Sequence, residues 1–118
     1  MPASTLDQQQ ISVINTITVP KGLELTAEKV RNDYIEYFKQ QAGFVSSTFY
    51  RSINNEADGS VKYVNIVVWA SNSHFEQVVN LGFSHAEGEN KDGKKVLGKG
   101  FPKPITVSPG QYFVLKQD

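Results

Sequence analysis

The feature that most constrains the fold of this chain is the order in which two hydrophobic periodicities succeed one another. Alternation with period 2 is typical of a half-buried strand, whereas a three-then-four spacing is typical of an amphipathic helix. The predicted elements are strand 11–19, helix 27–41, strand 44–53, strand 61–70, helix 72–81 and a last strand made of 105–107 and 112–115. This βαββαβ order predicts an α+β, ferredoxin-like fold: one antiparallel four-stranded sheet in spatial order 4-1-3-2, with both helices on one face.

Residues with known preferences at element ends set the predicted boundaries. Thr26 is the expected N-cap of the first helix and Ser71 that of the second, while Gly43 follows the first helix. The segment 54–60 contains Asp-Gly and predicts a hairpin connection. The Ser-Pro-Gly sequence at 108–110 predicts a break or bulge in the last strand.

The chain has 118 residues, which predicts a single domain over 11–118 after a flexible tail at 1–10. Twelve basic and twelve acidic residues cancel, so the charge balance favours neither nucleic acid nor a membrane as partner. The absence of cysteine excludes disulfides, thiolate metal sites and cysteine nucleophiles. No apolar run reaches the ~20 residues that span a bilayer, and we expect a cytoplasmic protein.

Strand 61–70 is apolar on both of its faces. Val64, Ile66 and Val68 face one way, while Tyr63, Val67 and Trp69 face the other. Two helices on one side of a sheet cover only one of these faces. A second copy of the chain, packed sheet to sheet, would cover the other face, so the sequence predicts a homodimer.

Two asparagines interrupt apolar strand faces that the topology places side by side. Asn15 lies in strand 11–19 and Asn65 in strand 61–70. An unmatched buried amide costs about 1–3 kcal/mol, so two amides on one patch favour a bound polar group over amides that simply bond the backbone. Trp69 shares the face of Asn65, either as core or as the wall of an aromatic pocket.

Further candidates are aromatic residues and a histidine. His85 follows the second helix, at the entrance to a glycine- and lysine-rich loop over 82–104, and is a candidate proton-transfer group. His74 and His85 have no carboxylate at ligand spacing, which argues against a metal site built on them. The loop is either a solvated connection or a basic lid. The candidate substrate-binding side chains are Tyr34, Phe38, Tyr63 and Phe75.

Three segments together resemble the antibiotic biosynthesis monooxygenase family of dimeric α/β barrels. They are VIN at Val13–Asn15, AGFVSSTFYRS at Ala42–Ser52 and VVWASNSHF at Val67–Phe75. The resemblance implies a homodimer whose subunits each oxidise a small aromatic phenol, hydroquinone or quinone-type molecule with O2, without flavin, haem or metal.

The resemblance also implies roles for particular residues. Asn65 and Trp69 match a pair that contacts substrate in the family, and Asn15 matches an asparagine used on the first strand. Phe75 stands in the place of a family aromatic without its hydroxyl, and the arginine that the family carries beyond it is missing.

Two alternatives stay open at the level of sequence. Haem degradation in the same fold uses an asparagine on the first strand, a tryptophan inside the second helix and a histidine shortly after it. Asn15 fits this pattern, but Val78 stands near the tryptophan position and His85 lies several residues early. The other alternative is a dimeric ligand-binding or stress-response module without turnover.

Overall fold

The structure is a computed structural model, and it describes residues 9–79 and 101–118. Predictions that fall on 1–8 and 80–100, among them His85, most of the 82–104 loop and the end of the second helix, lie outside the described residues. The elements are β1 (Ile11–Val19), α2 (Glu24–Phe38), β2 (Phe44–Arg51), β3 (Val61–Trp69), α3 (Asn72–Val78) and β4 (Thr106–Tyr112). The predicted α+β, βαββαβ order is confirmed.

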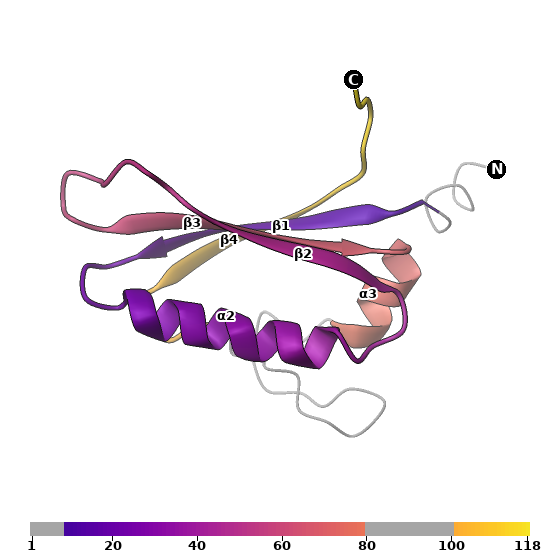
Figure 1. Ribbon diagram of the computed structural model, residues 1–118, viewed down its shortest axis with the longest axis horizontal. Coiled ribbons are helices and arrows are strands. Elements are labelled where there is room, and N and C mark those ends of the chain that lie inside the picture. The colour runs from indigo at the N-terminus through magenta and orange to yellow at the C-terminus, as the bar shows by residue number, and fades with distance from the viewer. Residues whose placement is uncertain (1–8, 80–100) are drawn as a thin grey trace.

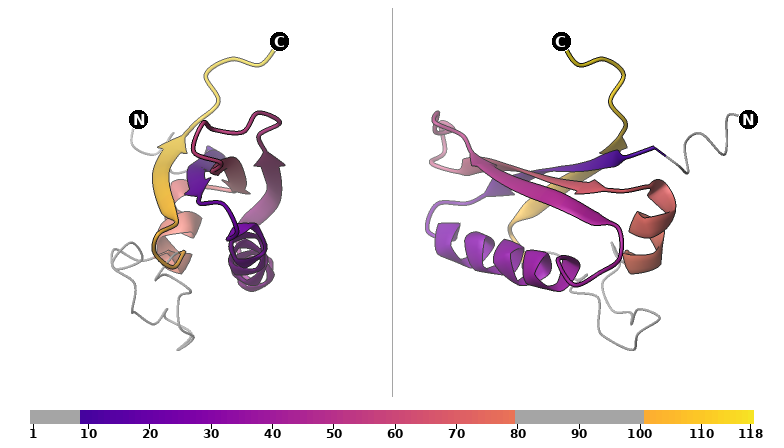
Figure 2. Two further views of the ribbon diagram at one scale, coloured as in Figure 1. Left: turned by 90° about the vertical axis from the view of Figure 1, so that its left-hand side faces the viewer. Right: turned by 45° about the vertical axis from the view of Figure 1, so that its right-hand side comes forward.

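All four strands belong to one antiparallel sheet in the order β2-β3-β1-β4. This is the predicted order 4-1-3-2 seen from the other edge, so β1 and β3 are the central pair. Both helices lie on the same side of the sheet, with α2 running beneath the strands and α3 at one end (Figures 1 and 2). The sheet therefore has one face that helices cover and one face that no described helix covers.

The first helix begins three residues earlier and ends three residues earlier than predicted. Its N-cap is Leu23, which makes no side-chain cap bond, and the Glu24 carboxylate accepts a hydrogen bond from the Gly22 amide at 2.8 Å. The predicted N-cap, Thr26, thus lies inside the first turn. In α3 the predicted cap is confirmed, since Ser71 Oγ accepts from the His74 amide at 3.2 Å.

The predicted break in the last strand is wrong. β4 continues through Ser108-Pro109-Gly110, and Pro109 pairs with Asn15 of β1. Because β4 is an edge strand, proline is tolerated where its missing N–H would face away from the sheet. Residues 113–115, predicted as part of the strand, lie beyond it and are exposed.

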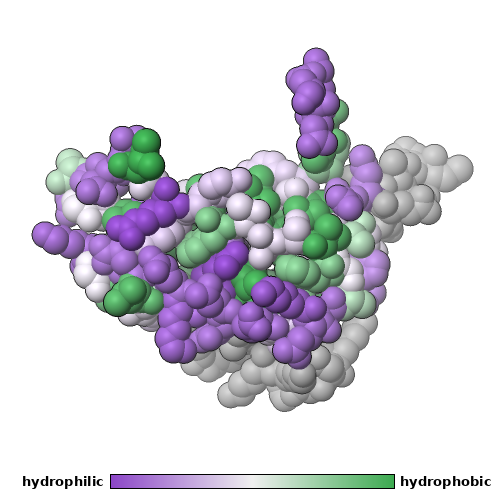
Figure 3. Space-filling view, viewed as in Figure 1, coloured by the Kyte–Doolittle hydropathy of each residue, from purple (hydrophilic) through white to green (hydrophobic). Residues whose placement is uncertain are grey.

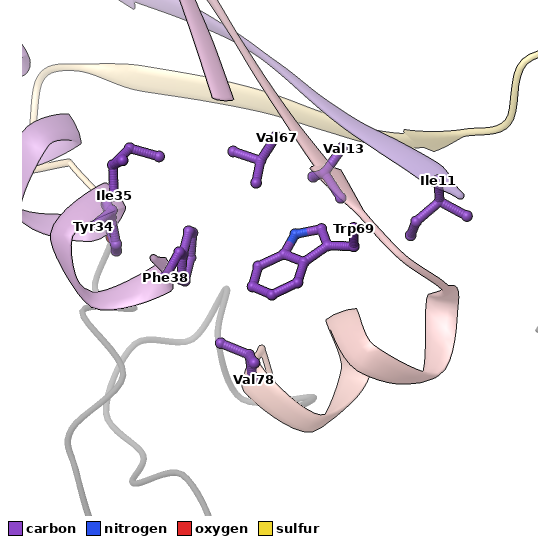
Figure 4. Close-up of a cluster of buried hydrophobic side chains, with 8 residues drawn as sticks. All are labelled: Ile11, Val13, Tyr34, Ile35, Phe38, Val67, Trp69 and Val78. Atoms are coloured by element: carbon purple, nitrogen blue, oxygen red, sulfur yellow. The ribbon is translucent and has the colours of Figure 1, made fainter. Parts of the chain in front are cut away.

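The helix-covered face holds two hydrophobic clusters. The cluster that we call the Trp69 cluster contains Ile11, Val13, Tyr34, Ile35, Phe38, Val67, Trp69 and Val78 (Figure 4). The second, the Tyr63 cluster, contains Ile17, Val19, Ala27, Val61, Tyr63 and Ile105. The inward-facing residues that separate the two clusters on the central strands are Asn15 and Asn65.

The opposite face of the sheet is apolar but less buried. Ile14, Val64, Ile66 and Val68 alternate with the core residues and are half-buried. The exterior of α2 is mainly hydrophilic, whereas hydrophobic residues show over the strands (Figure 3). The alternation that the sequence predicted for β3 is confirmed. None of the helices in 9–79 and 101–118 is long and apolar enough to cross a membrane.

Candidate functional site

Asn15 and Asn65 stand directly opposite each other across β1 and β3. Both belong to the alternating set that faces the helices, and Asn65 is only 6% exposed. The sequence prediction that these two amides share one patch is confirmed. They form a polar layer between the Trp69 cluster and the Tyr63 cluster.

Arg31 of α2 completes this polar layer. Its Nε donates to Asn65 Oδ1 at 3.0 Å, and its Nη2 donates to Ser47 Oγ of β2 at 3.3 Å. Arg31 follows the buried Ala27 by four residues and precedes the buried Tyr34 by three, so it lies on the helix stripe that faces the sheet. Three elements thus deliver polar side chains to one point.

The contact with Arg31 fixes the orientation of the Asn65 amide. A guanidinium has only donors, so the atom of Asn65 that faces it must be the carbonyl oxygen. The Nδ2 amine of Asn65 consequently points elsewhere as a hydrogen-bond donor. Asn15 Oδ1 is a buried acceptor without a hydrogen-bond partner among residues 9–79 and 101–118. The layer thus holds a donor and an unmatched acceptor on adjacent strands.

The surroundings of Arg31 are neutral. Its guanidinium lies 4.8 Å from the centroid of the Phe49 ring, and its Nη1 donates to Asn32 Oδ1 at 3.3 Å. Burial lowers the pKa of Arg31 from its ordinary value. None of the ion pairs within the described ranges involves this side chain. Within 9–79 and 101–118, its positive charge is therefore met by dipoles and a ring face.

The predicted aromatic residues around Trp69 come together at one end of the sheet. Trp69 is fully buried, and its ring centroid lies 5.4 Å from Phe38 and 6.3 Å from Phe75. Tyr34 stacks on Phe38 at 6.0 Å. Trp69 is four strand residues from Asn65, roughly 13 Å along the strand. Figure 4 shows Tyr34, Phe38 and Trp69 together in the Trp69 cluster.

Tyr63 lies on the other side of the polar layer. Its hydroxyl donates to Glu28 Oε2 at 2.8 Å, and Arg51 approaches the same oxygen at 3.7 Å. Burial, followed by the hydrogen bond to Glu28, raises the pKa of Tyr63 to about 12. Its ring stacks on Phe49 at 5.0 Å, and Phe49 also contacts Arg31. Tyr63 therefore adjoins the layer through Phe49, whereas its hydroxyl is engaged elsewhere.

Of the two histidines, the structure describes His74 only. His85 lies outside the described residues, so its proposed proton-transfer role stays a prediction. The His74 ring is half-buried, with Nδ1 2.8 Å from Ser71 Oγ. No group of three or more His, Asp or Glu residues suited to a metal ion occurs within 9–79 and 101–118.

Sequence reasoning missed Arg31. The signal was present, because an arginine four residues after Ala27 and seven before Phe38 falls on the helix stripe that otherwise carries buried residues. Val30, one residue away, is also close to this stripe and is partly buried against the Trp69 cluster. A charge on an apolar stripe marks a position where packing alone does not choose the residue.

Comparisons with known proteins agree with this geometry at the level of fold. No family model and no curated protein matches the sequence. A solved "putative monooxygenase" from Shewanella loihica PV-4 superposes with TM-score 0.69 at 20% identity, covering 92% of this chain and 97% of its own. SnoaB, a cofactor-independent oxygenase from Streptomyces nogalater, superposes with TM-score 0.63 at 24% identity, covering 92% and 96%.

A "putative antibiotic biosynthesis monooxygenase" from Bacillus cereus gives TM-score 0.56 at 19% identity, covering 93% of this chain and 97% of its own. This chain shares their fold. The similarity extends over nearly the whole length of each protein. The ferredoxin-like subunit fold that the sequence resemblance implied is thereby confirmed.

Proposed function

We propose that the protein is a cofactor-independent monooxygenase that oxidises a small aromatic phenol or hydroquinone with O2. The observation that carries the proposal is the polar layer: Asn65, whose carbonyl oxygen accepts from Arg31, stands opposite Asn15 and its unmatched acceptor across β1 and β3. Aromatic side chains adjoin it on both sides. The shared fold with SnoaB, which is named a cofactor-independent oxygenase, supports the same activity.

The chemistry requires no group beyond the substrate and the protein. A phenol whose keto tautomer carries an acidic CH2, as in an anthrone, loses a proton from that carbon to give the phenolate, and this anion transfers one electron to O2. The two radicals combine into a peroxide, which takes up a proton; loss of the second C–H proton then breaks the O–O bond. The sum is CH2 + O2 → C=O + H2O. The protein must stabilise the anion, accept the proton and exclude water.

The residues divide these tasks by their chemistry. Asn65 Nδ2 would donate to the developing oxyanion, and Asn15 Oδ1 would accept from a second hydroxyl of the substrate. Trp69, Phe38 and the other aromatic residues of the Trp69 cluster would pack against the substrate rings. His85 is our candidate for the proton-transfer group.

Oxygen uptake with a panel of anthrones and hydroquinones tests the proposal. Replacing one oxyanion donor lowers kcat by about 10²–10³, so Asn65→Ala should lose turnover by that factor. Asn54→Ala, in the exposed β2–β3 connection, is the matched control and should retain it. Isotopically labelled O2 should deliver one labelled oxygen atom to the product. Equal turnover in the two variants would remove Asn65 from the site.

We propose further that the protein is a homodimer through the sheet face opposite the helices. That face carries Ile14, Val64, Ile66 and Val68. The C-terminal segment rises on the same side of the sheet (Figures 1 and 2), and there Phe113, Val114 and Leu115 are 49%, 57% and 88% exposed. Covering this apolar surface with a second copy would remove it from water.

Sedimentation equilibrium tests the dimer. Ile66→Lys places a charge at the centre of the face and should shift the protein to monomer. Gln40→Lys, at an exposed position in the turn that follows α2, adds the same charge and should leave the mass unchanged. A monomeric wild type would refute the proposal.

A further inference from the structure

Arg31 is the one charged side chain that the structure places in the polar layer, and no carboxylate within the described ranges pairs with it. A partly buried guanidinium without a counter-charge loses hydration that dipoles replace only in part. Leucine or methionine at the same helix position would extend the apolar stripe between Ala27 and Tyr34. Hydrophobic packing alone therefore gives no reason for an arginine at this position.

The nearest acidic group along the helix is already engaged. Glu28, three residues before Arg31, accepts from the Tyr63 hydroxyl at 2.8 Å and lies 3.7 Å from Arg51. The side chains that the three adjoining strands direct at the layer are neutral: Asn15 from β1, Ser47 and Phe49 from β2, and Asn65 from β3. The charge of Arg31 is thus available to an anion.

A count of donors leads to the same result. Arginine has five N–H groups. Three are used, on Asn65, Ser47 and Asn32. One N–H on each terminal nitrogen therefore remains for a ligand.

From this arrangement we infer that Arg31 is a positioning and specificity-determining residue: it orients the Asn65 amide and selects the ionised, phenolate form of an aromatic ligand over the neutral form. The inference rests on the proposed function for the ligand class. The inference differs from the proposed function because it concerns only the binding of the ligand and includes no oxidation step. An arginine near an oxyanion lowers the pKa of the bound phenol, because the charge stabilises the ionised form.

The test uses para-nitrophenol, whose phenolate absorbs visible light, and para-nitroanisole, the same ring without an ionisable hydroxyl. Wild-type protein should bind the phenolate more tightly than the anisole, and the bound phenol should titrate at lower pH than the free one. Arg31→Met should weaken phenolate binding by about tenfold to a hundredfold, the range for a charge-assisted hydrogen bond. Anisole binding should change less than about twofold.

Two further variants separate the role of Arg31 from a general loss of charge or fold. Lys29→Met removes a positive charge from the exposed side of the same helix, where Lys29 pairs with Asp33 at 3.1 Å, and should leave both affinities unchanged. Arg31→Lys keeps the charge but loses the planar fork that holds Asn65. Arg31→Lys should therefore retain part of the preference for phenolate over anisole. If Arg31→Met does not fold, the affinities of Arg31→Lys test the inference instead.

The outcomes also distinguish this inference from the proposed function. An Arg31-dependent preference for phenolate, without oxygen uptake on any substrate, would sustain the inference and overturn the monooxygenase. Three outcomes would each overturn the inference. They are oxygen uptake with an unshifted pKa of the bound phenol, no phenolate binding by the wild type, and equal losses of affinity for phenolate and for anisole in Arg31→Met.

Discussion

Replacing Trp69 by alanine should cost the protein a large part of its stability. The side chain is fully buried in a central strand, with ring centroids of Phe38, Phe44 and Phe75 at 5.4, 5.9 and 6.3 Å. Truncation of a buried aromatic to alanine costs about 3–5 kcal/mol, against a total of about 5–15 kcal/mol for a typical domain. A chain of this length should then melt roughly 10–25 °C lower.

Urea unfolding followed by far-UV circular dichroism measures this loss, since Trp69 is the sole tryptophan and its fluorescence disappears with it. Trp69→Phe keeps a ring in the cluster and should cost only about 1 kcal/mol. A loss below about 1 kcal/mol in Trp69→Ala would refute the packing argument. Because Trp69→Phe is expected to stay folded, it is also the variant to use for turnover. Unchanged activity would exclude a substrate contact by the indole.

Two further predictions concern Tyr63 and Gly43. The Tyr63 pKa is raised from 10.0 to about 12, so the folded state holds its proton more tightly than the unfolded state. At neutral pH the wild type should be more stable than Tyr63→Phe by about 1 kcal/mol. This difference in unfolding free energy should be complete below pH 10 and decline as the pH rises through 12. Urea titrations at several pH values measure the difference, and a difference that is independent of pH would contradict the prediction. Gly43→Ala should destabilise by roughly 2–5 kcal/mol, because φ is +91° and the new Cβ would overlap His74. Gly22→Ala, with φ +95° and open space, should cost only the backbone share of about 1–2 kcal/mol, as thermal melts of both can show.

The sequence sufficed for the topology and the facing of the central strands, because period-2 alternation determines which side chains are buried. The limits of Ile11–Val19 agree fully with the structure, and the Asn15–Asn65 pairing follows from the strand order. The ends of α2 were less predictable, since Leu23 caps the helix without a side-chain hydrogen bond. Pro109 misled the prediction because local turn preference cannot reveal that a strand lies at the sheet edge.

The least predictable feature of the site was Arg31. Its role depends on which strand position lies beneath it, and that position is set by the packing of α2 on the sheet. The helix period alone does not distinguish Arg31 from its apolar neighbour Val30, and both side chains are half-buried. A close pair such as Arg31 and Asn65, separated by 34 residues in the chain, is a tertiary contact that periodicity does not encode.

The position of the polar layer between two apolar clusters also bears on how the strands find their alignment. A two-residue slip of β1 against β3 would keep every side chain on its proper face, so alternation alone does not forbid it. Such a slip would place Val13 or Ile17 opposite Asn65 and carry Asn15 into an apolar cluster. Moving that amide among hydrocarbon side chains costs energy that the native alignment avoids. The asparagines that we propose to bind a ligand thus also favour the native register of the central strands during folding.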